Sequence, residues 1–141
     1  MQNIQAKKMK MTQIWKNGSV FAVSPLKLAE SSNVDSFKEG DLLKIVGKTK
    51  SKGFQGVVKR HGFGGGPKTH GQKNRYRAPG SIGSTAMQRV VPGRKMAGRM
   101  GGDRKTLKNI EVMLIIKEKA TVLVKGSVPG NTGDKLMLNK L

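Results

Sequence analysis

The sequence predicts a mainly β protein: a small β-barrel with a long, basic and largely irregular arm inserted between two of its strands. Short runs rich in Val, Ile and Leu lie near both ends of the 141-residue chain. No segment keeps an apolar period of 3.6 residues beyond two turns, which argues against long helices. Between the apolar runs, residues 59–105 contain few apolar side chains and follow no period. A loop of this length in a compact domain is either functional or disordered.

The first part of the predicted barrel, residues 1–58, begins with a hairpin. Its turn contains Asn17-Gly18, a pair that suits a tight hairpin because both residues tolerate positive φ. Ser24-Pro25 predicts a bend or a sheet edge after this hairpin. Trp15 is expected in the core. The strands predicted in this part are residues 11–15, 20–23, 41–46 and 54–58.

The second part of the barrel, residues 106–141, carries the clearest strand signal. Two runs rich in Val, Ile and Leu, residues 110–117 and 120–125, are separated only by Glu118-Lys119 and predict a hairpin. A turn at Val128-Pro129-Gly130 follows, and residues 130–135 are expected to form a hairpin turn before a last strand at 135–138. The runs are short and barely alternate, as expected for a closed barrel with both faces partly covered. We therefore predict one barrel domain, with residues 59–105 as an inserted arm.

The charge of the chain indicates an anionic partner. Lys and Arg number 28 against 8 Asp and Glu, a formal net charge of +20 at pH 7. Nucleic acid is the commonest such partner and an anionic membrane surface the second. The longest apolar run, residues 112–116, is far shorter than the roughly 20 residues that span a bilayer. Cysteine is absent, which excludes disulfides and thiolate metal sites and is typical of a reducing compartment, so we expect a cytoplasmic protein.

The arm holds most of the residues expected to contact nucleic acid. It contains 12 Lys or Arg, a single acid (Asp103), and 11 of the 19 glycines. Guanidinium groups fork onto phosphate oxygens and stack on bases, and glycines let backbone N–H groups approach a polyanion. Tyr76 and Phe63 are candidates for stacking on unpaired bases. The residues predicted to bind RNA are Lys52, Lys59, Arg60, His61, Lys68, His70, Lys73, Arg75, Arg77, Arg89, Arg94, Lys95, Arg99, Arg104 and Lys105.

The sequence does not predict catalysis, a metal site or a cofactor. The glycine run at 62–66 resembles a dinucleotide-binding loop, but Pro67 occupies the place of the third glycine and no βαβ context surrounds it. His61 and His70 have no cysteine partner, and Asp103 is the only nearby acid. Two alternatives to a structural RNA-binding role remain: an RNA-modifying or nucleotide-using enzyme, and a nonspecific nucleic-acid-compacting protein.

A succession of rarer motifs resembles one known family. The motifs are residues 51–60 (SKGFQGVVKR), 66–71 (GPKTHG), 77–83 (RAPGSIG), 93–101 (GRKMAGRMG) and 123–130 (LVKGSVPG). Their identity and order resemble the universal large-subunit ribosomal protein family called L three, in its bacterial form. The resemblance covers nearly the whole chain from Lys7 onward.

The resemblance implies a translation-protein-type β-barrel on the outer surface of the large ribosomal subunit, with the arm running through rRNA toward the peptidyl transferase centre. It implies a structural role in early subunit assembly, with large-subunit rRNA and neighbouring ribosomal proteins as partners. No membrane, small-molecule substrate or cofactor is implied beyond the structural Mg ions of the rRNA. The tip of the arm would be formed by Gly83, Ser84, Thr85, Ala86, Met87 and Gln88.

The chain departs from the family pattern at two places. Bacterial members carry a substantial stretch between the opening hairpin and the run that corresponds to residues 37–46, whereas here only residues 29–36 follow Leu28. A trimmed barrel is therefore expected. Some members carry a modified glutamine near the arm tip, but Gln88 is offset from that position, so the modification is not expected here.

Overall fold

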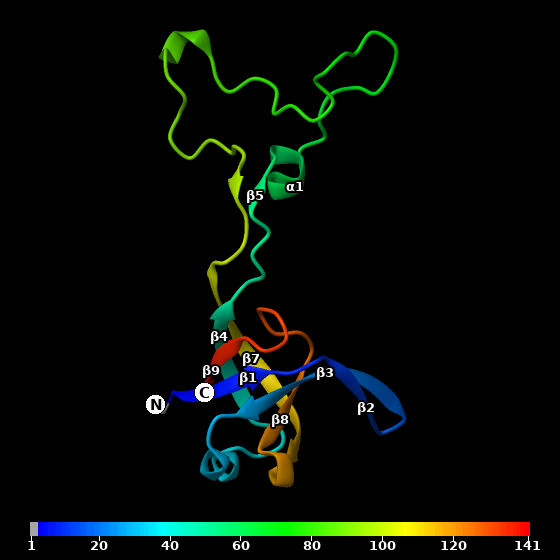
Figure 1. Cartoon of the computed structure of the whole chain (residues 1–141), viewed down its shortest axis with the longest axis vertical. Coiled ribbons are helices and arrows are strands. Elements are labelled where there is room, and N and C mark those ends of the chain that lie inside the picture. The colour runs from blue at the N-terminus through cyan, green and yellow to red at the C-terminus, as the bar shows by residue number, and fades with distance from the viewer. Residues whose placement is uncertain (1–2) are drawn as a thin grey trace. The chain divides into compact units, whose positions relative to one another are not determined.

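The structure, a computed structural model, describes residues 3–141 and shows a mainly β protein. The chain forms two compact units, which are coloured by residue number in Figure 1. The first unit takes in Met1–Lys50 and Gly102–Leu141, and the second unit is Ser51–Gly101. Residues 59–101 of the predicted arm lie in the second unit, whereas residues 102–105 lie in the first.

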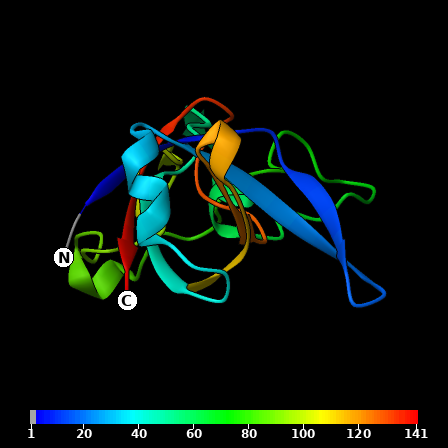
Figure 2. The same ribbon diagram turned by 90° about the horizontal axis from the view of Figure 1, so that it is seen from below.

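The first unit is a closed antiparallel barrel, which confirms the predicted fold class. Its strands pair in the order β1 (Ile4–Lys8), β9 (Lys135–Lys140), β4 (Leu42–Lys48), β7 (Arg104–Ile116), β8 (Thr121–Lys125) and β3 (Ser19–Leu28). The barrel closes because β1 pairs with both of the outer strands: Ala6 lies opposite Leu136 of β9 and opposite Leu28 of β3. Within the described residues, β2 (Thr12–Lys16) pairs only with β3, and Figure 2 shows this hairpin at the end of the long β3 strand.

Alternate side chains of each strand fill the barrel interior. In β9, Leu136 and Leu138 are buried while Lys135 and Met137 are exposed, as the period of two along a strand requires. The same alternation buries Ile4 and Ala6 of β1. Each buried Leu, Ile or Val stabilises the fold by about 1.5–3 kcal/mol. The core residues are Ile4, Ala6, Leu26, Leu28, Val34, Phe37, Leu43, Ile45, Val112, Val122, Val124, Val128, Leu136 and Leu138.

The opening hairpin is confirmed, but the expected position of its tryptophan is wrong. Asn17 and Gly18 both adopt positive φ (52° and 72°) in the turn between β2 and β3. Trp15 is 74% exposed, opposite Val20 of β3. Val20 has the same orientation along β3 as the interior residue Leu26, but the hairpin extends past the barrel. Among the described residues, Trp15 and Val20 on this face are therefore both exposed.

Pro25 does not interrupt the strand, contrary to the expected bend or sheet edge. β3 continues through it to Leu28, and Pro25 lies opposite Leu123 of β8. Its carbonyl oxygen accepts a hydrogen bond from the N–H of Met9 (2.9 Å), on the side away from β8. In a β-strand the nitrogen and the carbonyl of one residue point to the same side, so the Pro25 nitrogen also points away from β8, toward the segment that joins β1 to β2. The missing N–H of proline therefore costs no ladder bond to β8.

The short connection after β3 still supplies core side chains. A 3₁₀ helix, η1 (Ser31–Ser36), joins β3 to β4. Val34 within it and Phe37 just after it are both buried in the barrel core. This connection therefore covers the end of the barrel where β3 finishes and β4 begins.

The C-terminal strands are confirmed, but one connection differs from the prediction. β7 and β8 form the expected hairpin through the 3₁₀ helix η3 (Lys117–Lys119) and Ala120, whose φ is 46°. Residues 130–135 do not form a hairpin turn, because β9 pairs with β1 and β4 rather than with β8. The Lys8 ammonium holds this connection by donating to the carbonyls of Val128 and Gly130, each at 2.7 Å.

The run at residues 54–58, expected to be one strand, divides into two elements. Only β5 (Phe54–Gln55) is a strand, and α1 (Val57–His61) is a short helix. Gly56 is extended immediately before the helix, and Gly62 ends it with a φ of 73°. Val57, the first residue of this helix, is buried. The glycines at both ends, Gly56 and Gly62, allow the chain to enter and leave the single helical turn.

Candidate nucleic-acid interface

The base of the second unit is a small framework of backbone hydrogen bonds. β5 pairs with β6 (Gly98–Arg99), so that Phe54 lies opposite Arg99. Next to this pair, the N–H of Lys52 donates to the carbonyl of Met100, and the N–H of Met100 donates to the carbonyl of Gly53, both at 2.9 Å. The two ends of the unit are thus held together, although the hydrogen-bonded residues Lys52 and Met100 lie 48 positions apart in the sequence.

Side chains of α1 anchor a distant loop to this framework. Arg60 donates from Nη1 to the carbonyl of Met96 at 2.6 Å, and Nε2 of His61 lies 2.9 Å from the same oxygen. Gly98 permits the approach, since a Cβ there would stand 2.7 Å from Nη1 of Arg60. Two of the predicted RNA-binding residues, Arg60 and His61, are therefore half-buried and bonded within the protein.

Residues 66–76 form a loop that closes on itself. The N–H of Gly66 donates to the carbonyl of Tyr76 at 3.0 Å, and the Tyr76 hydroxyl donates to the carbonyl of Gln72 at 3.0 Å. Gly65 has a φ of 75°, and any Cβ there would overlap the Tyr76 carbonyl oxygen. The glycines were predicted to let the backbone approach a polyanion, whereas Gly65 allows a close approach to the protein's own chain.

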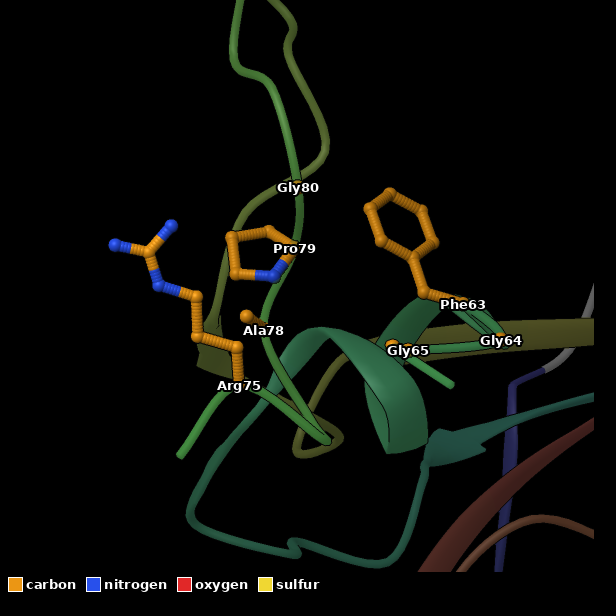
Figure 3. A pocket seen from close by; sticks show the side chains of 8 residues that line it. Phe63, Gly64, Gly65, Arg75, Ala78, Pro79 and Gly80 are labelled. Carbon is orange, nitrogen blue, oxygen red and sulfur yellow. The ribbon is translucent and has the colours of Figure 1, made fainter. Parts of the chain in front are cut away.

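An open hollow of about 450 Å³ lies beside the closed loop, and we call it the Phe63 hollow. Its walls are residues 63–66 on one side and Arg75 with residues 78–80 on the other. Figure 3 shows the Phe63 ring on one side and Pro79 across from it, with the Arg75 side chain on the far side of Pro79 and directed away from Phe63. The His61 ring contacts Phe63 with ring centroids 5.9 Å apart and tilted by 41°. The Phe63 ring is thus held by a histidine that is itself bonded to the Met96 carbonyl.

The predicted tip residues lie in an exposed loop with one ordered turn. Ser84 Oγ accepts a hydrogen bond from the N–H of Ala86 at 3.4 Å and begins the 3₁₀ helix η2 (Thr85–Met87). Gln88 ends it with a φ of 49°. All six residues from 83 to 88 are exposed, Met87 by 62%. Farther along, the Arg94 guanidinium donates to the carbonyl of Ser81 and ties the two limbs of the loop together.

The predicted cations are largely available to a partner. Of the fifteen predicted residues, all except Arg60 and His61 are exposed. The second unit contains 11 Lys or Arg and no Asp or Glu. Within residues 3–141, the four ion pairs that the structure shows all lie in the first unit. Arg104 and Lys105 belong to β7 of the first unit, where they lie opposite Lys48 and Gly47 of β4.

Phe54 is an exposed aromatic residue that the sequence reasoning missed. Its side chain is 76% exposed in β5, where Phe54 lies opposite Arg99. The prediction placed it in a strand at residues 54–58 and gave it no role in binding. The available signal was its flanking sequence, since glycines on both sides leave an aromatic ring with few neighbours to cover it.

Two negative findings concern the described residues alone. Residues 3–141 contain no cluster of three or more His, Cys, Asp or Glu side chains that could hold a metal ion. None of the helices in this range is long and apolar enough to cross a membrane.

Fold and charge together define a class, that of small basic β-barrel proteins with an acid-free, glycine-rich second unit. Comparison with known proteins gives the family. The family model described as Ribosomal protein L3 matches residues 3–121, so the chain belongs to the ribosomal protein L3 family, as its motifs predicted.

Known relatives carry the name "Large ribosomal subunit protein uL3". The protein of Herpetosiphon aurantiacus is 55% identical over 109 residues, which are 77% of this chain and 51% of the relative. Those of Chlorobaculum parvum and Chlorobium limicola are each 54% identical, over 69% and 70% of this chain and 47% of each relative. The chain thus spans about half the length of the curated relatives it matches.

Proposed function

We propose that the chain is a structural constituent of the large ribosomal subunit that binds large-subunit rRNA through its second unit and catalyses no reaction. One observation carries the proposal: 11 cations and no acid are held on an ordered framework of loops. The names of the relatives support the same assignment. A polyanion is the partner that relieves the mutual repulsion of so many like charges.

The mechanism is neutralisation of phosphates by a surface that is already ordered. Each phosphate contact made by Lys or Arg releases counterions, so affinity for RNA falls steeply with salt. The hydrogen bonds at Met96, Tyr76 and Met100 hold the loops in place before binding. Less conformational entropy is then lost on binding than with an unstructured cationic loop.

The finer parts of the proposal follow from the family resemblance. Residues 83–88 would approach the peptidyl transferase centre, and the barrel would contact neighbouring ribosomal proteins during early assembly. The protein would need no cofactor of its own, and Mg ions would belong to the rRNA. Its location would be the ribosome in the cytoplasm. The exposed, ordered turn at Ser84 and Ala86 supports a role for this loop in contacting RNA.

The test is the salt dependence of rRNA binding after removal of charge from one unit at a time. One variant carries four Gln substitutions, at Lys68, Lys73, Arg75 and Arg77. The control carries four Gln substitutions at exposed first-unit lysines for which the described structure shows no ion pair: Lys27, Lys108, Lys119 and Lys135. Binding to large-subunit rRNA is measured for both variants and the unaltered chain across a series of KCl concentrations.

We expect the slope of log affinity against log salt to become shallower by about three in the second-unit variant, at 0.7–0.9 per phosphate contact. The control should change far less. Equal effects in the two variants would contradict the assignment of the second unit as the binding surface. Equal affinity for rRNA and for duplex DNA at the same salt would favour the nonspecific nucleic-acid-compacting protein instead.

A further inference from the structure

The geometry points to the Phe63 hollow as a binding site for a single unstacked RNA base. This assignment rests on the proposed rRNA binding and names one of the groups that would be bound. The hollow lies wholly within the second unit. Its volume of about 450 Å³ falls in the range of about 300–1,000 Å³ typical of small-molecule sites, so one nucleotide fits.

The chemistry of the walls suits a flat apolar group. Phe63, Ala78 and Pro79 contribute apolar side chains, and Gly64 and Gly80 have open space where a side chain would stand. RNA-binding proteins recognise unpaired bases by stacking them on aromatic rings. The Phe63 ring is suited to this because His61 contacts it and Met96 fixes His61, so little rotational freedom remains to be lost on stacking.

The charge around the hollow selects a nucleotide over an apolar side chain of another protein. The adjoining residues Arg75 and Arg77 are exposed cations, and the whole unit has no acid. A partner for this surface must therefore combine a flat apolar group with negative charge. A nucleotide does so, because its base can stack on Phe63 while its phosphate lies against the guanidinium groups.

The backbone at two glycines, Gly65 and Gly66, determines the shape of the hollow. Gly65 must be glycine because its φ is 75° and a Cβ would overlap the Tyr76 carbonyl oxygen. At Gly66, a Cβ would stand 2.6 Å from Nε2 of Gln72 and 2.8 Å from the carbonyl oxygen of Arg75. The backbone at Gly65 and Gly66 therefore lies close to residues 75 and 76 of the opposite wall, and the hydrogen bond from the Gly66 N–H to the Tyr76 carbonyl holds the two walls together.

Two variants of the full chain test the site by different routes. Phe63→Leu keeps an apolar side chain but removes the stacking ring. Gly64→Leu keeps the ring and adds bulk beside it; Gly64 has ordinary φ and no atom within 4 Å of its would-be Cβ, so the substitution is not strained. Trp15→Leu, which removes an exposed aromatic from the first unit, is the control. Amide resonances of Gly66 and Tyr76 report whether the walls remain folded.

We expect both hollow variants to bind large-subunit rRNA about tenfold more weakly at a fixed KCl concentration, within the cost of losing one base stack. The salt slope should stay unchanged because no cation is lost. Trp15→Leu should bind like the unaltered chain. If the unaltered chain and both hollow variants bind rRNA equally, the assignment of the hollow is overturned while rRNA binding stands. If the unaltered chain itself fails to bind rRNA, the proposed function falls and this assignment with it.

A second measurement identifies the group that enters the hollow. Adenosine 5′-monophosphate should shift the Phe63 ring proton resonances of the unaltered chain, and Gly64→Leu should abolish the shift. Ribose 5-phosphate, which lacks the base, should leave these resonances in place. Equal shifts with both compounds would overturn base recognition and indicate a phosphate site.

Discussion

Gly47 of β4 provides a quantitative test of how tightly the barrel is packed. It is buried, and a Cβ at this position would overlap Cδ2 of Leu136 in β9 and lie 3.4 Å from Cβ of Pro129. Leu136 is itself fully buried in the core. Gly47→Ala should therefore overpack the interior and lower the free energy of unfolding by about 1–3 kcal/mol.

The partner substitution removes the atom that would be overlapped. Leu136→Ala alone should cost about 2–5 kcal/mol, because it deletes buried apolar surface and leaves a cavity. If the two sites were independent, the double variant would lose the sum of both costs. Since the methyl group added at position 47 would enter the space left by the Leu136 side chain, we expect the double variant to be no less stable than Leu136→Ala. The coupling free energy should be at least about 1 kcal/mol.

Urea unfolding followed by far-UV circular dichroism measures these free energies. The fluorescence of Trp15 is a poor probe because its ring is mostly exposed in the folded protein. Gly64→Ala is the matched control: no atom lies within 4 Å of the added Cβ and φ is not positive, so stability should barely change. Additive costs of Gly47→Ala and Leu136→Ala would refute the packing argument, as would a Gly47→Ala variant as stable as the unaltered chain.

Three further predictions concern the charged and aromatic residues of the first unit. The Lys140 ammonium, 2.6 Å from the Asp41 carboxylate, and the Lys38 N–H lower the pKa of Asp41. The ionised Asp41 carboxylate therefore stabilises the folded protein fully above the ordinary pKa of an aspartate, and this stabilisation is lost as pH falls through the lowered pKa. Asp41→Asn should cost less than about 1 kcal/mol at pH 6 and nothing at strongly acid pH, as urea unfolding across pH can check. Burial lowers the pKa of Lys8, so the unfolded chain binds that proton more tightly, and stability should rise as pH climbs from the lowered value to the ordinary lysine pKa. Lys8→Met should abolish this rise and cost about 1–3 kcal/mol, since two backbone carbonyls lose their donor. Trp15→Ser should change stability by less than about 0.5 kcal/mol, and the fluorescence of the single Trp should be quenched by acrylamide almost as readily as free indole.

Features that depend on a few neighbouring residues could be predicted from the sequence. The Asn17-Gly18 turn is one, because positive φ is a property of those two residues. The β7–β8 hairpin is another, because its two apolar runs are close neighbours in the sequence. The charge of the second unit and its lack of acid are compositional, so they follow from the sequence alone.

Features that depend on which distant segments meet could not be predicted in this way. Trp15 belongs to an apolar strand pattern, and only the length of β3 beyond the barrel leaves it exposed. The partners of β9 follow from barrel closure around the whole sheet, which a local turn signal cannot reveal.

The second unit shows the same division. Sequence alone determined that it is cationic, glycine-rich and suited to a polyanion. Only the tertiary structure decided that His61 and Arg60 are bonded to Met96 and that Phe63 faces a hollow. The physical reason is range: charge and turn preference belong to single residues and their neighbours, whereas those contacts join residues 35 and 36 positions apart along the chain.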